Sequence, residues 1–147
     1  MTTKELQQYL LREFPQENAC CEWNELKNLK NSFAGDEKND VISYVSAIAN
    51  MEGGHLVIGV QDKTLEIVGT DLTKFNLNAQ SAVWKLIEHC TNLSSEGLSI
   101  NEYITEDTQK TVWVIHIPKH LPRRPVYAHK KAWQRVEDSL VEMTQER

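Results

Sequence analysis

Residues 46–60 read SAIANMEGGHLVIGV and carry the clearest helix, turn and strand signals in the chain. The first part of this stretch has the apolar spacing of a buried helix face, and its two glycines permit a tight reversal because glycine adopts positive φ at no steric cost. The apolar run that follows is typical of a strand. The stretch therefore predicts a helix that begins at an N-cap at Asp36 and ends near Asn50, a turn, and a strand over His55–Val60. We expect the Asn50 amide to cap the helix end or hold the turn.

The segments on either side mix helix and strand patterns. Helices are predicted at residues 4–13 and 78–93, strands at 65–68, 98–104 and 111–117, a polar turn at 106–110, and a hairpin over 126–136 with His129, Lys130 and Lys131 at its tip. In the strongest strand, Trp113, Ile115 and Ile117 alternate with Val112, Val114 and His116. No regular strand–helix–strand repeat occurs, so we predict a single compact α+β domain: a mixed, mostly antiparallel sheet with two to three packed helices.

Charge is distributed unevenly along the 147 residues. The chain has 16 lysines and arginines against 21 aspartates and glutamates, a formal net charge of −5, which argues against a general cationic nucleic-acid coat. Residues 119–136 nevertheless contain no acid and carry the basic residues Lys119, Arg123, Arg124, Lys130, Lys131 and Arg135. We call this segment the basic strip. By itself it fits a solvated hairpin and a polyanion-binding surface equally well.

The sequence has no feature of a secreted or membrane protein. No apolar run follows a basic N-terminal region, and the longest apolar runs are far too short to span a bilayer. The cysteines are Cys20, Cys21 and Cys90, and their spacing fits neither a disulfide framework nor a paired zinc motif. We therefore expect reduced thiols and a cytoplasmic location.

Several segments, in order, resemble the motifs of the Schlafen AlbA_2 family. Residues 17–23 (ENACCEW) are similar to its Glu-x-x-x-x-Glu-Phe opening, and residues 46–54 to its Ala-Phe-Ala-Asn-x-x-Gly-Gly turn. The further matches are 56–62 (LVIGVQD), 67–69 (IVG), 124–127 (RPVY) and 132–139 (AWQRVEDS). The resemblance implies an AlbA_2-like domain over residues 15–143, with a helix at 1–14 before it and a tail at 144–147 after it.

The resemblance also implies a metal site. In Schlafen-type ribonucleases a Glu, Glu, Asp trio carries catalysis, and the matching residues here are Glu17, Glu22 and Asp62. Carboxylates are the ligands that Mg²⁺ and Mn²⁺ prefer, and such an ion can activate water and stabilise the charge that builds on a phosphodiester. One position departs from the family: the Lys that usually follows Glu-Phe is replaced by Asn24, which removes a charge next to the expected site.

Three functions follow from these observations. The first is nucleic-acid binding, to RNA or DNA, with Arg123, Arg124, Lys130, Lys131 and Arg135 on phosphates and Tyr127 stacked on a base. The second is metal-dependent endoribonuclease activity at the acidic trio, and the third is a non-catalytic protein-interaction or regulatory role. Trp133 is expected in the core, and the histidines of the strands are expected to be structural.

The expected assembly and cofactors complete these predictions. Schlafen-type enzymes enclose nucleic acid between two such lobes, so a single lobe predicts a homodimer. The sequence contains no phosphate-binding glycine loop, and we expect no nucleotide cofactor and no membrane partner.

Overall fold

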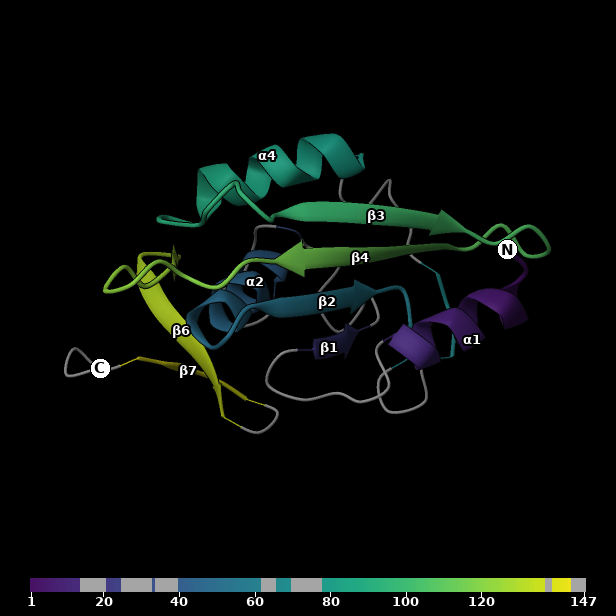
Figure 1. The fold of residues 1–147 in the computed structure, drawn as a ribbon, viewed down its shortest axis with the longest axis horizontal. Coiled ribbons are helices and arrows are strands. Elements are labelled where there is room, and N and C mark those ends of the chain that lie inside the picture. Colours follow the sequence, from purple (N-terminus) through teal and green to yellow (C-terminus); the bar gives the residue numbers. More distant parts are fainter. Residues whose placement is uncertain are drawn as a thin grey trace.

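The computed structural model describes residues 1–13, 21–24, 33, 40–61, 66–69, 78–136 and 139–143. The elements, in chain order, are α1 (Thr3–Glu13), β1 (Cys21–Asn24), α2 (Val41–Asn50), β2 (Gly54–Ile58), α4 (Ala79–His89), β3 (Ser99–Ile104), β4 (Thr111–Ile117), β5 (Tyr127–Ala128), β6 (Lys131–Val136) and β7 (Ser139–Glu142). Figure 1 shows one main sheet with helices around it and a smaller sheet beyond its end.

The main sheet has the strand order β1-β2-β4-β3. β1 runs parallel to β2, whereas β2 with β4 and β3 with β4 are antiparallel, and the second sheet, β5-β6-β7, is antiparallel throughout. The predicted class is confirmed: the protein is an α+β domain with a mixed, mostly antiparallel sheet.

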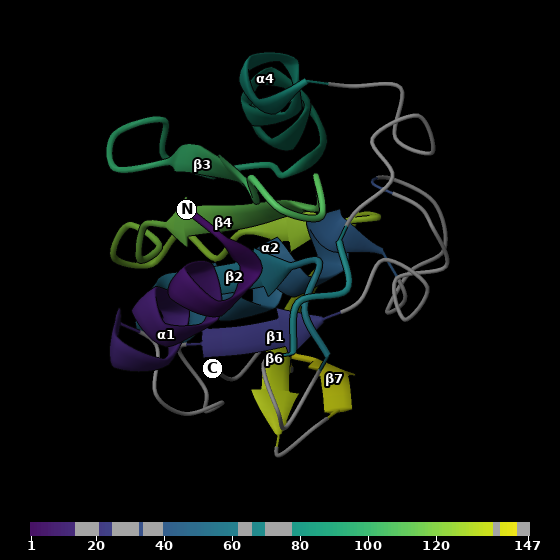
Figure 2. The same ribbon diagram turned by 90° about the vertical axis from the view of Figure 1, so that its right-hand side faces the viewer.

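The centre of the main sheet is buried on both faces, and β4 shows why. Trp113 and Ile115 lie in the larger core cluster with residues of α2 and α4. Val112 and Val114 lie in a second cluster with Leu6 and Leu10 of α1. The two-residue period of a strand produces this division, as the sequence predicts. Figure 2 shows α1 and α2 on opposite sides of the sheet.

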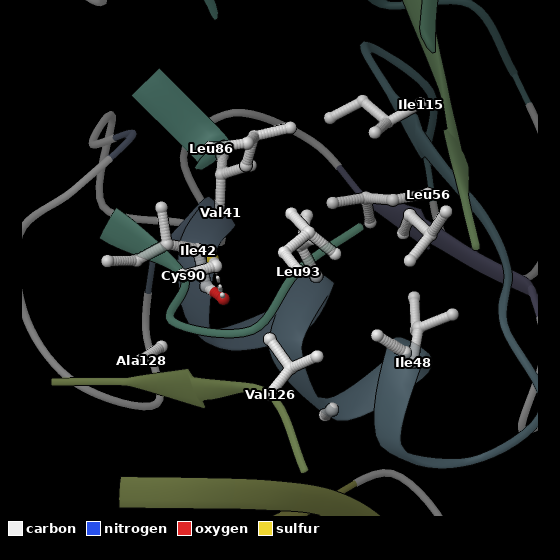
Figure 3. Close-up of a cluster of buried hydrophobic side chains, with 14 of the residues drawn as sticks. Val41, Ile42, Ile48, Leu56, Leu86, Cys90, Leu93, Ile115, Val126 and Ala128 are labelled. Carbon is white, nitrogen blue, oxygen red and sulfur yellow. Dashed lines mark hydrogen bonds between the residues drawn. The ribbon is translucent and has the colours of Figure 1, made fainter. Parts of the chain in front are cut away.

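The larger core connects the sheet to the hairpin. Figure 3 shows Ile48 of α2 and Leu56 of β2 in the same buried cluster as Val126 and Ala128, which come from the segment that begins the small sheet. All four side chains are fully buried. Trp133 of β6 belongs to the same cluster, so its predicted core position is confirmed. The hairpin is therefore a packed part of the domain.

Gly53 makes the turn between α2 and β2 possible. Its φ is +75°, and its amide donates to the carbonyl of Ile48 at 3.0 Å, which closes the helix end. A Cβ atom here would lie 2.7 Å from the backbone nitrogen of Lys119. Glycine is thus required both by the left-handed backbone and by the close approach of the segment after β4.

Three predicted boundaries were wrong. α2 begins at Val41 after an N-cap at Asp40, not at Asp36, because the extended Asp40 accepts a hydrogen bond from the amide of Ser43. α4 ends at His89 instead of continuing to residue 93, because Thr91 leaves the helix to pair with Tyr127. β2 ends at Ile58, because Gly59 has a φ of +106°.

The structure differs in detail from the strand predicted over 65–68 and from the hairpin predicted over 126–136. Val60 and Ile67 form an isolated antiparallel bridge, and residue 65 lies outside the described residues. The hairpin forms with His129 and Lys130 as its turn, while Lys131 already belongs to β6. β7, which pairs with β6, was not predicted. In the part of the chain described, no helix is long and apolar enough to cross a bilayer.

Candidate nucleic-acid interface

The turn of the β5-β6 hairpin presents the basic strip to solvent. His129 and Lys130 have φ values of +55° and +65°, the left-handed pair that a two-residue hairpin turn requires. The Lys130 side chain is exposed, and Tyr127 is 36% exposed although its neighbour Ala128 is buried. Lys131 is half-buried, with its Nζ 5.8 Å from the centre of the Trp133 ring, a cation–π contact that holds its stem against the core.

Asn50 holds this hairpin in place. Its Nδ2 donates to the carbonyl oxygens of Val126 at 2.9 Å and Trp133 at 2.8 Å, and its Oδ1 accepts from the Val126 amide at 2.7 Å. Ser46, one turn earlier on α2, also donates to the Val126 carbonyl. The expectation that Asn50 acts on its own turn was wrong: its amide bonds to two backbone segments of the hairpin, at Val126 and Trp133, that are distant from it in sequence.

A buried carboxylate fixes the turn from the other side. Asp40 has no exposed surface, and its Oδ2 lies 2.8 Å from Nε2 of His129. Its Oδ1 accepts from both the amide and the hydroxyl of Ser43. One residue therefore caps α2 and binds the hairpin turn. Sequence reasoning missed this pair, because both residues have ordinary local explanations as a helix cap and a turn residue.

A cavity of about 410 Å³ lies beside the turn, between the hairpin and the end of α4. Tyr127 forms part of its wall and is held by two backbone hydrogen bonds with Thr91, of 2.9 and 3.0 Å. The lining residues are Ile42, Glu88, His89, Thr91, Tyr127, His129 and Lys130. The cavity joins an aromatic ring to a cation, two groups that together suit a base and its phosphate.

The remaining residues of the basic strip differ in exposure. Arg123, with φ of +61°, and Arg124 are both exposed in a turn after β4. Lys119 forms an ion pair with Glu52 at 3.1 Å, which reduces its value as a phosphate contact. Arg135 belongs to β6 opposite Leu140, and its side chain lies outside the description.

The predicted metal residues fall largely beyond what the structure describes. Glu17 and Asp62 are outside the described residues, and Glu22 is described only by its backbone, which pairs with Leu56 in the parallel β1-β2 ladder. Their convergence therefore stays a prediction. Within the described part of the chain there is no group of three or more His, Cys, Asp or Glu residues that could hold a metal ion.

Fold and surface together define a small α+β domain with a cationic hairpin. The sequence profile of the Schlafen AlbA_2 family matches residues 22–144, so the chain belongs to that family. The matched segment begins at Glu22 and does not include Glu17.

Two solved structures are similar to the chain. A crystal structure of a protein from Corynebacterium diphtheriae has a TM-score of 0.58 at 16% identity, over 95% of this chain and 27% of that one. The chain thus spans about a quarter of that relative's length. The N-terminal domain of a RecG-related protein from Nitrosomonas europaea, solved by NMR, has a TM-score of 0.48 at 18% identity, over 100% of this chain and 93% of that domain. The similarity to the Corynebacterium diphtheriae protein shows a shared fold and nothing further.

Proposed function

We propose that this is a cytoplasmic protein that binds RNA or DNA through its β5-β6 hairpin and the loop before it. The observation that carries the proposal is the rigid presentation of Lys130 and Tyr127 next to a cavity. Lys130, Arg123 and Arg124 are exposed cations in an acid-free segment. Because Asn50 and Asp40 anchor the hairpin, little conformational entropy would be lost when a ligand binds. Family membership supports the same class of ligand.

The stacking part of the proposal assigns Tyr127 to an unpaired base. Stacking on an aromatic ring contributes about 1–3 kcal/mol per base. Tyr127→Ala is therefore expected to weaken binding about 5- to 150-fold, whereas Tyr127→Phe should retain nearly all of it. Equal losses in the two variants would mean that the hydroxyl, and not the ring face, makes the contact.

Fluorescence anisotropy with labelled single-stranded RNA and DNA tests the phosphate contacts. Lys130→Glu is compared with Lys4→Glu, an identical charge change at an exposed position on α1. We expect Lys130→Glu to weaken binding and to reduce the slope of log affinity against log salt by about 0.7 per lost contact. The Lys4→Glu control should have the affinity and the salt dependence of the wild type. The same affinity and slope for both variants would refute a hairpin interface and would favour the protein-interaction role.

A metal-dependent endoribonuclease is the second candidate function. Its support is the pairing of β1 with β2, which puts the backbone of Glu22 next to the strand that leads towards Asp62. We propose that Glu17, Glu22 and Asp62 hold Mg²⁺ or Mn²⁺. Structured RNA should then be cleaved in Mn²⁺ by the wild type and not by Glu22→Gln. Binding without cleavage, or cleavage that persists in a chelator, would exclude this function.

We further propose that the protein acts as a homodimer. One hairpin offers a short contact surface, and a two-fold axis would place two such surfaces on one nucleic acid. Sedimentation analysis of the free protein tests the proposal, which a monomer at the concentrations used for binding would contradict.

A further inference from the structure

The cavity beside the hairpin turn has walls of opposite electrostatic character. One wall is the last turn of α4, which contributes Glu88 and His89, and another is the hairpin turn, which contributes His129 and Lys130. The ring of Tyr127 also lines the cavity. A ligand that fills this space therefore meets a carboxylate, an ammonium group and an aromatic ring.

The α4 wall attracts hydrogen-bond donors. Glu88 is exposed, and among the residues that the structure describes its carboxylate has no hydrogen-bond or ion-pair partner. α4 ends at His89, and the C-terminal end of a helix carries a partial negative charge that adds to that of the carboxylate. The exposed His89 ring can donate or accept. This wall suits the N–H groups of a ligand and repels a phosphate.

The hairpin wall attracts anions. Lys130 is exposed, and within the described part of the chain its ammonium group forms no ion pair. The neighbouring His129 is fixed by the buried Asp40, whose Oδ2 lies 2.8 Å from Nε2 of the ring. Because a carboxylate only accepts, that ring nitrogen carries a hydrogen. The Asp40 bond thus holds the turn that presents the Lys130 cation.

The two walls are tied together by backbone hydrogen bonds. The Thr91 amide donates to the Tyr127 carbonyl at 2.9 Å, and the Tyr127 amide donates to the Thr91 carbonyl at 3.0 Å. Thr91 follows the end of α4 by two residues, so this pair joins the helix directly to β5. The volume of about 410 Å³ lies within the range of about 300–1,000 Å³ that small-ligand sites have. The cavity is therefore formed before a ligand arrives, and its size suits one unpaired nucleotide.

The four bases differ in what they offer to a carboxylate. The Watson–Crick edge of guanine carries two adjacent donors, N1–H and the N2 amino group, which match the two carboxylate oxygens. Adenine and cytosine each place one amino group beside a ring nitrogen that only accepts, and the N3–H of uracil lies between two carbonyl oxygens. Proteins read unpaired bases along this edge, and bidentate contacts with a charged group are the strong ones. Guanine is thus the base that fits the Glu88 carboxylate.

We propose that the cavity binds a single unpaired guanine nucleotide, with its base stacked on Tyr127, its donor edge on Glu88 and its phosphate on Lys130. The inference rests on the proposed nucleic-acid binding by the hairpin and adds base specificity to it. The ligand has the same polarity as the cavity, since it is anionic at the phosphate and rich in donors at the base edge. It also gives the acid a role, because a carboxylate that met no donor here would only repel a polyanion.

Fluorescence anisotropy with labelled oligouridine that contains a single central guanosine, adenosine, cytidine or inosine tests the base preference. We expect the wild type to bind the guanosine strand about 5- to 150-fold more tightly than the adenosine, cytidine and unsubstituted strands. Inosine lacks the N2 amino group, so its strand should have an intermediate affinity. A strand with 7-deazaguanosine keeps the same donor edge and should match guanosine. An inosine strand that binds no worse than the guanosine strand would contradict the two-donor contact.

Glu88→Gln separates the contact from the charge, because the two effects change affinity in opposite directions. The variant should bind the guanosine strand less tightly than the wild type does. The other strands should bind as tightly as before or more tightly, because a negative charge beside the nucleic acid has been removed. Glu96→Gln, at an exposed position outside the cavity, is the matched control and should keep the wild-type preference. An unchanged guanosine preference in Glu88→Gln, or an equal loss in the control, would overturn the proposal.

Failure of this inference can be distinguished from failure of the proposed function. Equal affinity of the wild type for every strand would overturn guanine recognition and leave nucleic-acid binding by the hairpin intact, whereas no binding to any strand would overturn both. NMR spectra of the wild type locate the base without any substitution. The guanosine strand should shift the amide signals of Thr91 and Tyr127 further than the adenosine strand does. A guanosine preference without these shifts would place the base outside the cavity and refute the proposal.

Discussion

Replacement of Asn50 by alanine is expected to be among the most damaging single changes on α2. Asn50 is only 7% exposed and makes three hydrogen bonds to the hairpin backbone. Val126 is fully buried, so its amide would lose its acceptor at a cost of about 1–3 kcal/mol. The two lost donor bonds add about 0.5–1.5 kcal/mol each, reduced at Val126 because Ser46 still donates to its carbonyl.

The expected total is about 2–4 kcal/mol in the free energy of unfolding, or a fall in melting temperature of about 6–12 °C at the midpoint of that range. Urea unfolding, followed by two independent probes, measures the free energy. Amide hydrogen exchange at Val126 locates the effect, because its protection should fall more than that of residues in β4.

Ser46→Ala provides the matched control. It removes one buried hydrogen bond to the same carbonyl and leaves that carbonyl with Asn50 as donor, so about 1 kcal/mol is expected. Asn50→Asp should be at least as harmful as alanine, because a carboxylate would face two carbonyl oxygens in a buried site. A loss in Asn50→Ala no larger than that in Ser46→Ala would refute the reasoning that Asn50 anchors the hairpin.

Three further predictions concern the backbone at Gly53, the histidines of the main sheet and the buried thiol of Cys90. Gly53→Ala should destabilise by at least about 1 kcal/mol more than Gly97→Ala in urea unfolding: both have left-handed φ, but only at Gly53 would the new Cβ meet backbone atoms. The free energy of unfolding should be highest above pH 6.5 and fall as the pH drops through 6.5 towards the lowered pKa values of His55 and His116, since the unfolded chain takes up protons first. Replacing both histidines with glutamine should flatten that dependence, and an unchanged slope would contradict it. Burial raises the pKa of the Cys90 thiol to about 12. In a variant whose other cysteines are changed to serine, a thiol reagent at pH 8 should therefore react with Cys90 only after denaturation. Rapid reaction of the native protein would contradict this prediction, because it would show that the site opens.

The strands β2, β3 and β4 of the main sheet could be predicted because their causes are local. The alternation in Thr111–Ile117 specifies a strand with two apolar faces, and both faces are buried. Helix boundaries were less accurate, since Asp36 and Asp40 have the same intrinsic capping ability. Asp40 is bonded to Ser43 and His129, and the second of these partners is distant in sequence, whereas Asp36 lies outside the described residues.

The family, the α+β class, the turn at Gly53 and the acid-free basic strip could be predicted from the amino-acid sequence, because motifs, periodicity, turn preference and charge are properties of neighbouring residues. The pairing of buried polar groups could not be predicted in this way, because it depends on how the chain packs. Asn50 bonds to Val126 and Trp133, and His55 faces His116, because the strands pack in one register. A buried polar group must find a partner, but its sequence position does not say which one, since only the packed chain brings the partner within hydrogen-bonding distance.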